Sequence, residues 1–105
     1  MKQTRLRPIS KKRAEEMRKY FPLVEELRQL CDNRSELSGD IPGWPSNFQA
    51  EPHHIEGRSG KRLLDLFNII MLTRTEHDTI RQTHTKEELL ALVRDIRIKQ
   101  GLKEV

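Results

Sequence analysis

The first regular pattern along the chain is that of an amphipathic helix beginning near Ser10. Its apolar positions recur every three or four residues, at Ala14, Met17, Phe21, Val24 and Leu27. This is the spacing of one helix face, and Lys, Arg and Glu fill the opposite face. Pro22 interrupts the pattern, because proline lacks the backbone donor and clashes with the preceding turn. The sequence therefore predicts a kink or a new helix at Pro22, giving two helical pieces that end near Cys31.

A long loop is predicted over residues 32–49, where Asp, Asn, Ser, Gly and Pro cluster. The loop also carries apolar side chains that can fold down onto the body of the domain: Leu37, Ile41, Trp44 and Phe48. Long loops inside small domains are usually functional or packed by their own side chains. Trp44 is interpreted here as a packing anchor in preference to a base-stacking residue.

Two strands are predicted in the middle of the chain. Residues 49–55 have strand-like potential, and residues 63–72 end in the apolar run Ile69, Ile70, Met71 and Leu72, which is short enough for a buried strand. Residues 56–61 lie between them and contain two glycines and a serine among charged residues. This segment is therefore predicted to be a flexible turn.

Two helices are predicted after the second strand. Thr73 or Thr75 can cap a short helix that begins near Arg74 and is interrupted at residues 83–85. Thr85 and Glu88 have the spacing of a capping box for the last helix. The apolar face of that helix consists of Leu89, Leu92, Val93 and Ile96.

Length and composition limit the class of protein. The chain has 105 residues, which is enough for one domain with a modest core. Its single cysteine, Cys31, cannot form an internal disulfide or a cysteine-based zinc knuckle. No apolar run approaches the ~20 residues of a membrane span, and the basic start of the chain lacks the apolar region of a secretion signal. We therefore expect a soluble cytoplasmic protein that has no membrane partner.

The positive charge is concentrated at the start of the chain. The whole chain carries a formal charge of +4, whereas residues 1–20 hold eight Lys and Arg side chains against Glu15 and Glu16. Such a distribution fits an electrostatic contact with a phosphate backbone, because each neutralised phosphate releases counterions. A solvated, partly disordered tail is an equally good interpretation of the arm alone. The predicted organisation is a basic arm over residues 1–9 and a single domain over residues 10–105.

Histidines and an asparagine lie at the joints of the predicted strand, loop, strand and helix. His53 and His54 end the first strand, Asn68 opens the second and His77 lies in the helix. Thirteen residues separate His54 from Asn68, and eight separate Asn68 from His77. This order and spacing resemble the HNH nuclease family. The likeness covers about a third of the chain and is carried by Glu51-Pro52-His53-His54-Ile55, Gly57-Arg58, Asn68-Ile69-Ile70-Met71-Leu72 and Glu76-His77.

The resemblance implies an α+β fold with a ββα-metal core, also called the HNH or His-Me finger, over about residues 49–82. N- and C-terminal helices flank this core, as in a small phage or bacterial type of the family. By resemblance, His53 and His77 bind one divalent metal ion and His54 is the general base that takes a proton from water. Asn68 matches the residue that braces the backbone of the histidine-bearing strand. Adjacent strand residues point to opposite faces, so one site shared by His53 and His54 requires distortion near residues 56–60.

Phosphodiester cleavage also needs fixed cations near the site. Arg58 is the favoured contact with the DNA backbone, because its loop position follows the two histidines, and it is grouped with His54 and Asn68 as a catalytic candidate. Further candidates for contact with DNA are Lys61, Arg62 and Arg81 near the site and Lys11, Lys12 and Arg13 near the basic arm.

The sequence departs from the family pattern in two places. Some members have a second helix histidine one turn after the first, but that position here is Arg81. His84 lies seven residues after His77, which is ~10 Å of helix, so we interpret it as a turn residue and expect two protein ligands for the metal. Many members also bind a structural zinc through paired cysteines. We expect none here, with packing by Leu37, Trp44, Phe48 and Phe67 in its place and with Cys31 buried at a helix end.

The leading functional hypothesis is a metal-dependent endonuclease that hydrolyses DNA phosphodiester bonds. Its ion would be Mg, Mn, Ni, Co or Zn, and two imidazoles without a carboxylate favour the last four by affinity. The alternative is a catalytically inactive HNH-like module that binds DNA through the basic arm and the loop. A third hypothesis, a helical protein-interaction domain, rests on the amphipathic terminal helices. A homodimer is compatible with double-strand cleavage, but no interface can be identified in the sequence.

Overall fold

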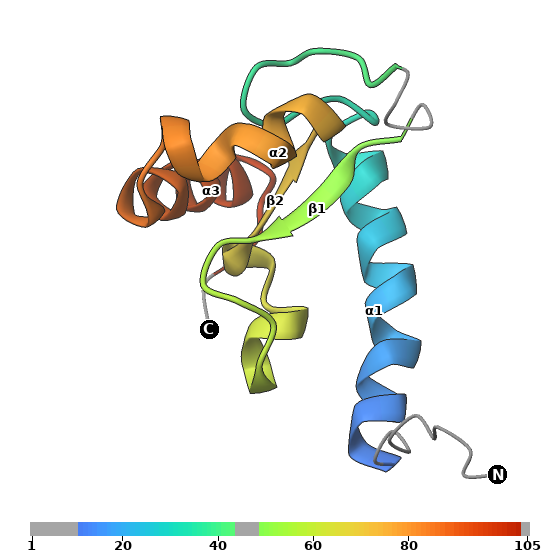
Figure 1. Cartoon of the computed structure of the whole chain (residues 1–105). Coiled ribbons are helices and arrows are strands. Elements are labelled where there is room, and N and C mark those ends of the chain that lie inside the picture. Colours follow the sequence, from blue (N-terminus) through green and yellow to red (C-terminus); the bar gives the residue numbers. More distant parts are fainter. Residues whose placement is uncertain (1–10, 44–48, 104–105) are drawn as a thin grey trace, which may run out of the picture.

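The protein is described here by a computed structural model that covers residues 11–43 and 49–103. It has a two-stranded antiparallel sheet packed between helices, so the predicted α+β class is confirmed (Figure 1). The elements in chain order are α1 (Lys11–Leu30), β1 (Glu51–His54), the 3-10 helices η1 (Gly60–Leu64) and η2 (Leu66–Asn68), β2 (Ile69–Leu72), α2 (Arg74–Thr83) and α3 (Lys86–Lys99). The basic arm, Ser10, Trp44 and Phe48 lie outside the described residues.

The sheet separates two apolar clusters. In its register His53 pairs with Ile70 and His54 pairs with Ile69. On one face Ile69 and Met71 pack with Tyr20, Val24 and Leu27 of α1 and with Leu63 of η1. On the other face Ile70 and Leu72 pack with Ile80 of α2 and with Leu89 and Val93 of α3. Figure 1 shows this arrangement, with α1 along one side of the strands and α2 and α3 along the other.

Helix α1 runs through Pro22 without a break, so the prediction of two helical pieces is wrong. Pro22 and Arg18, whose carbonyl would accept the missing bond, are both exposed residues, so water can replace that bond. The buried face of α1 consists of Tyr20, Val24 and Leu27. Phe21, predicted to lie on this face, is 63% exposed, because Tyr20 takes the buried position beside it. Helix α1 is therefore one straight support along the sheet.

The chain reaches β2 through helical turns. The apolar segment 63–72 is a strand only from Ile69, because residues 60–68 form η1 and η2. The side chain of Asp65 accepts a hydrogen bond from the backbone N–H of Phe67 and begins η2. After β2, a capping box of Thr73 with Glu76 begins α2, and a capping box of Thr85 with Glu88 begins α3. Both helices begin where the sequence predicted.

A buried ion pair joins distant parts of the chain. Arg97 of α3 is fully buried, and its Nη1 lies 2.5 Å from Oε2 of Glu36. The same guanidinium donates to the carbonyl oxygens of Leu66 and Ile69, at 3.0 and 2.8 Å. Glu36 in turn accepts from the N–H of Met71 at 2.9 Å. One buried network of hydrogen bonds and an ion pair thus joins the loop after α1 to the strand β2 and the helix α3.

Two smaller predictions are corrected by burial. Cys31 is half-buried at the end of α1 and is a free thiol, whereas the sequence predicted a buried residue. Leu92 and Ile96 of α3 are also only half-buried, because Arg97 occupies the most buried position of that turn. In the described ranges, no helix has both the length and the apolar character needed to cross a bilayer.

Candidate active site

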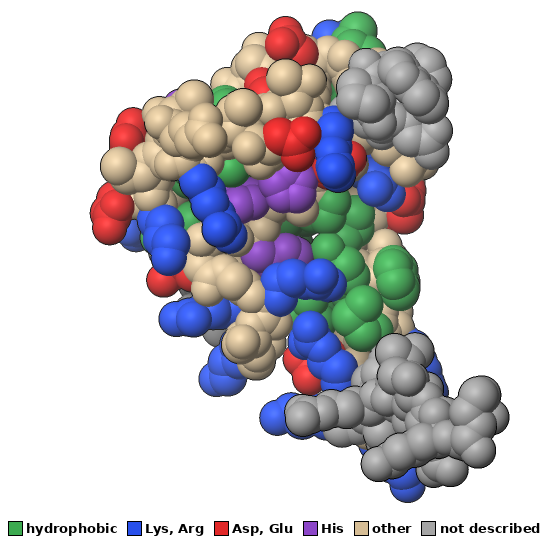
Figure 2. All heavy atoms as spheres, viewed as in Figure 1, with side chains coloured by type: hydrophobic (Ala, Val, Ile, Leu, Met, Phe, Trp, Pro, Cys, Tyr) green, Lys and Arg blue, Asp and Glu red, His purple; other side chains and the backbone are tan. Residues whose placement is uncertain are grey.

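His53 and His77 face each other across the junction of β1 and α2. Their rings meet edge to face, with centroids 5.1 Å apart. His53 is buried at 7% exposure, whereas the side chain of His77 is 32% exposed. Histidine side chains gather in the middle of the face shown in Figure 2, with Lys and Arg side chains on both sides. The fold thus brings together the two residues for which the sequence predicted metal binding.

Glu51 fixes the protonation of His77. Nδ1 of His77 lies 3.1 Å from Oε1 of Glu51. Because an ionised carboxylate can only accept, Nδ1 carries a proton and donates it, so that in the neutral ring the lone pair lies on Nε2. Glu51 lies two residues before His53 and so on the same face of β1. Sequence analysis quoted Glu51 without giving it a role, although this two-residue spacing was visible.

His53 is held in the neutral form. Its pKa is lowered from 6.5 to about 4, first by burial and then by the nearby positive charges of His77 and Arg81, with a smaller contribution from His54. A neutral imidazole is the form that binds a metal ion, because the lone pair is free of a proton. His53 is therefore ready to act as a ligand throughout the neutral range.

His54 lies on the other face of β1 and is oriented by a backbone carbonyl. Its Nε2 is 3.2 Å from the carbonyl oxygen of Leu63. Since a carbonyl can only accept, Nε2 carries the proton and Nδ1 has a free lone pair. Burial lowers the pKa of His54, the bond to Leu63 acts against this, and the charges of Arg58, Arg13 and His77 lower it further. This is the state required of a general base.

Helix α1 contributes two residues beside His54 that the sequence did not assign to its surroundings. The ring of Tyr20 lies 5.6 Å from that of His54, between centroids. The guanidinium of Arg58 stacks on the ring of Tyr20, 5.2 Å from the centre of that ring. Nη1 of Arg13 donates to the carbonyl oxygen of Arg58 at 3.4 Å. Periodicity could not identify Tyr20, because Tyr20 and Phe21 both fit the spacing of the apolar face.

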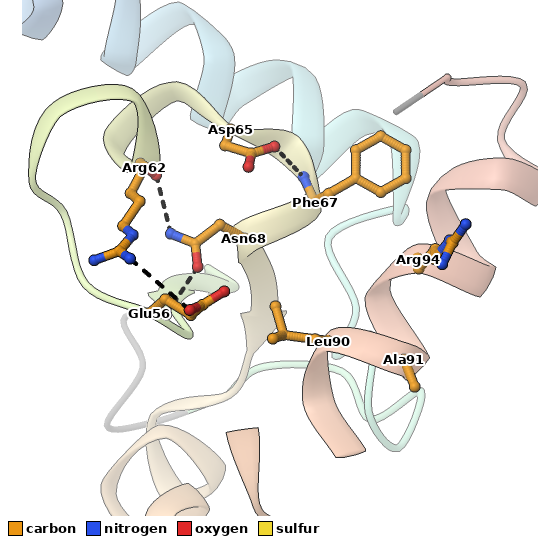
Figure 3. Close-up of a pocket in the computed structure, with 8 residues that line it drawn as sticks. All are labelled: Glu56, Arg62, Asp65, Phe67, Asn68, Leu90, Ala91 and Arg94. Atoms are coloured by element: carbon orange, nitrogen blue, oxygen red, sulfur yellow. Dashed lines mark hydrogen bonds and ion pairs between the residues drawn. The ribbon is translucent and has the colours of Figure 1, made fainter. Parts of the chain in front are cut away.

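Asn68 ties together the loop that follows β1. Its Oδ1 accepts from the N–H of Glu56 at 2.8 Å, and its Nδ2 donates to the carbonyl oxygens of Gly57 at 2.9 Å and Arg62 at 3.0 Å. Figure 3 shows this side chain pointing into the loop beside Arg62. Gly57 has a φ of 90°, a backbone conformation that suits glycine. The side chain of Asn68 therefore bonds only backbone groups here and holds the segment between His54 and Arg62.

The predicted DNA-contact residues fall into two sets. Arg13 and Arg58 lie near His54, and the charge of Arg81 acts on His53. Arg62 points elsewhere, 4.0 Å from Glu56, and lines a separate hollow with Phe67 and Arg94 (Figure 3). The remaining three are exposed and, among the described residues, have no hydrogen bond or ion pair with the histidines: Lys11, Lys12 and Lys61.

The two histidines of β1 lie on opposite faces of the strand. The register is regular through His54, so His53 and His54 point to opposite faces without the distortion that the sequence analysis required. In a two-stranded sheet, however, the outer edge of β1 is not covered by a third strand. The charge of His77 also affects the pKa of both His53 and His54. His53 and His54 are therefore neighbours along β1 that face opposite sides of the sheet, and the charge of His77 acts on both.

The donor set suits a divalent ion. His53 is neutral, and Nε2 is the nitrogen of His77 that Glu51 does not bond. An ion about 2.1 Å from one nitrogen of each ring would place the ring centres roughly 5 to 6 Å apart. The ring centres of His53 and His77 are 5.1 Å apart, with the rings inclined edge to face. In residues 11–43 and 49–103 no group of three or more His, Cys, Asp or Glu side chains has the geometry of a metal site.

Comparison with known proteins gave no match to a family model, to a curated protein or to a solved structure.

Proposed function

We propose that the protein is a metal-dependent endonuclease of the HNH type that hydrolyses DNA phosphodiester bonds. The observation that supports this proposal is that His54 has a different hydrogen-bond partner and position from the facing residues His53 and His77. His54 has one nitrogen bonded to the carbonyl of Leu63 and the other free, while His53, which is held neutral, faces His77 with ring centroids 5.1 Å apart. The order of β1, β2 and α2, with Asn68 directly before β2, resembles the ββα-metal core of that family.

In the proposed reaction, the free Nδ1 of His54 takes a proton from the attacking water while its Nε2–H stays bonded to Leu63. His53 and His77 would hold the divalent ion, which would supply neutralisation of charge at the phosphate oxygens and the leaving group. Arg58, stacked on Tyr20, binds the backbone phosphate on the His54 side. The expected products carry a 5′-phosphate and a 3′-hydroxyl, as the resemblance implies.

The test is a plasmid-nicking assay with Mg, Mn, Ni, Co or Zn added to chelator-treated protein. Replacing His54 by Ala is expected to lower the rate by about 10²–10⁴-fold, the usual contribution of a positioned base. Gln82→Ala, at an exposed position of α2, is the matched control and is expected to cleave at the normal rate. Persistent cleavage by purified His54→Ala protein would exclude His54 as the base.

A DNA-binding module without catalysis is the second candidate, and the exposed cations favour it. Arg81 and Lys61 form no ion pair with a described carboxylate, so they remain available for phosphates. This candidate requires salt-dependent DNA binding that neither a chelator nor His54→Ala changes. Binding with those properties, together with no nicking in any metal, would replace the nuclease proposal.

A further inference from the structure

A hollow of about 440 Å³ opens beside His53, between the end of β1 and the junction of α2 with α3. Its lining includes Ile55, Arg81, Lys86 and Leu89. We infer that this hollow is a nucleotide subsite, which receives one unpaired nucleotide of the DNA next to the phosphate that is cut. This inference rests on the proposed nuclease function and adds to it the class of substrate.

The charge around the hollow suits a phosphate. Arg81 and Lys86 supply two cations from α2 and α3, and His84 of the α2–α3 junction supplies an imidazole. Neither Arg81 nor Lys86 is ion-paired with a carboxylate of the described residues. The acidic residue of the lining, Glu56, lies 4.0 Å from Arg62. An anionic group is therefore attracted to the hollow, and Arg81 places it within reach of His53.

The remaining lining suits the uncharged part of a nucleotide. Ile55 and Leu89 are core residues, 4% and 3% exposed, whose remaining surface borders the hollow. A volume of about 440 Å³ lies in the range of small-ligand sites and exceeds the space that an inorganic anion fills. The combination of cations at the wall with aliphatic side chains matches a phosphate joined to a sugar and a base.

Entry into such a hollow requires the nucleotide to leave the base stack. Unstacking a paired base costs a few kcal/mol, and the cost is least for a mismatched or single-stranded nucleotide. DNA with an unpaired nucleotide beside the cut is therefore the expected substrate class. Fully paired DNA is expected to be cut more slowly by the same site.

The first test uses thymidine 5′-monophosphate and NMR of the metal-free protein. The backbone N–H signals of Ile55 and Leu89 are expected to shift, and Lys86→Ala is expected to weaken binding about five-fold. Lys99→Ala is the matched control, since it removes the same charge from α3 about 20 Å away along the helix. Equal shifts with inorganic phosphate alone, or none with the mononucleotide, would overturn the subsite.

The second test compares cutting of a paired duplex with cutting of the same duplex carrying one unpaired nucleotide. Faster cutting of the second substrate, with the difference lost in Lys86→Ala, is the expected result. Equal rates for the two substrates would contradict the preference. Absence of cutting in every metal would contradict the nuclease proposal instead, and the mononucleotide titration would still decide whether the subsite exists.

Discussion

At the scale of single residues, His53, His54 and His77 differ in their hydrogen-bond partners and in the causes that set their protonation. Nδ1 of His77 donates a hydrogen bond to Glu51, Nε2 of His54 donates one to the carbonyl of Leu63, and His53 is kept neutral by burial and neighbouring charge. A base needs one free lone pair that points at water, and a ligand needs one that points at an ion. These partners therefore give three chemically identical side chains different surroundings, as the proposed division into one base and two ligands requires.

Metal affinity should depend on Glu51. Glu51→Ala removes the acceptor of the His77 Nδ1 proton, so the ring can rotate or change tautomer. Loss of such a partner typically weakens metal binding 10–100-fold, and calorimetric titration with Mn or Zn measures it. Glu87→Ala, at an exposed position of α3, is the control. Unchanged affinity in Glu51→Ala would show that His77 does not need this carboxylate.

The pKa of His53 predicts how the stability of the metal-free protein depends on pH. The unfolded chain binds a proton at this residue near pH 6.5, whereas the folded chain does so only near pH 4. Between these values the unfolded state holds more protons, so the free energy of unfolding falls as the pH is lowered. The loss is about 2 kcal/mol once solvent screening is allowed for.

Urea unfolding in chelator at pH 7.5 and at pH 4.5 measures this loss. In His53→Gln, which cannot titrate in this range, the difference between the two pH values is expected to shrink. A difference equal to that of the natural sequence would mean that other groups cause the pH dependence.

At the scale of elements, α1 is part of the site as well as a cover for the sheet. The ring of Tyr20 packs beside the ring of His54, and the guanidinium of Arg58 stacks on the ring of Tyr20. Arg13 of α1 binds the backbone of the loop that contains Arg58. Helix α1 therefore contacts both His54 and the loop that carries Arg58.

Tyr20 and Phe21 are adjacent aromatic residues with opposite environments, which makes them a matched pair. Tyr20→Ala should lower the free energy of unfolding by about 3 kcal/mol or more, because it leaves a cavity against His54. Phe21→Ala should change it by less than about 1 kcal/mol, since that ring is 63% exposed. Urea unfolding measures both, and Tyr20→Phe should retain the stability. Equal losses at the two positions would show that Tyr20 is not the anchor.

Elements with local signals could be predicted from the sequence, and those set by distant partners could not. The capping threonines Thr73 and Thr85 mark the starts of α2 and α3 within four residues of chain, so both helices were found. The choice of Tyr20 for the buried face depends on His54, which is far from it in sequence. The three histidines and Asn68 were identifiable by their spacing, whereas the carbonyl of Leu63 has no side-chain signal at all.

At the scale of the whole molecule, the pair of Arg97 and Glu36 joins parts of the chain 61 residues apart. It fixes α3 against β2 and the loop after α1, and it adjoins the turns that hold Asn68. Sequence analysis could not find it, because a charged residue on a helix is normally assigned to the solvent side. The backbone of Ile69, which pairs with His54 across the sheet, is thus held by this buried ion pair.

Breaking this pair should be costly. Arg97→Met leaves the carboxylate of Glu36 buried without its partner, so the free energy of unfolding should fall by about 3 to 5 kcal/mol. The exposed pair of Lys99 and Asp95 provides the comparison, and Lys99→Ala should cost less than about 1 kcal/mol. Thermal and urea unfolding measure the free energy of unfolding of both variants. Equal losses in the two variants would contradict a central role for Arg97.

The regular register of β1 has a consequence for how the chain tolerates length changes. Side-chain direction along a strand alternates, so inserting or deleting one residue ahead of the histidines would send His53 to the α1 face and His54 to the α2 face. Such a change would exchange the positions of the proposed ligand and the proposed base while leaving the composition of the segment intact. Related chains that retain the chemistry should therefore differ in this segment by substitution or by even numbers of residues, and single-residue gaps should occur only in the loops.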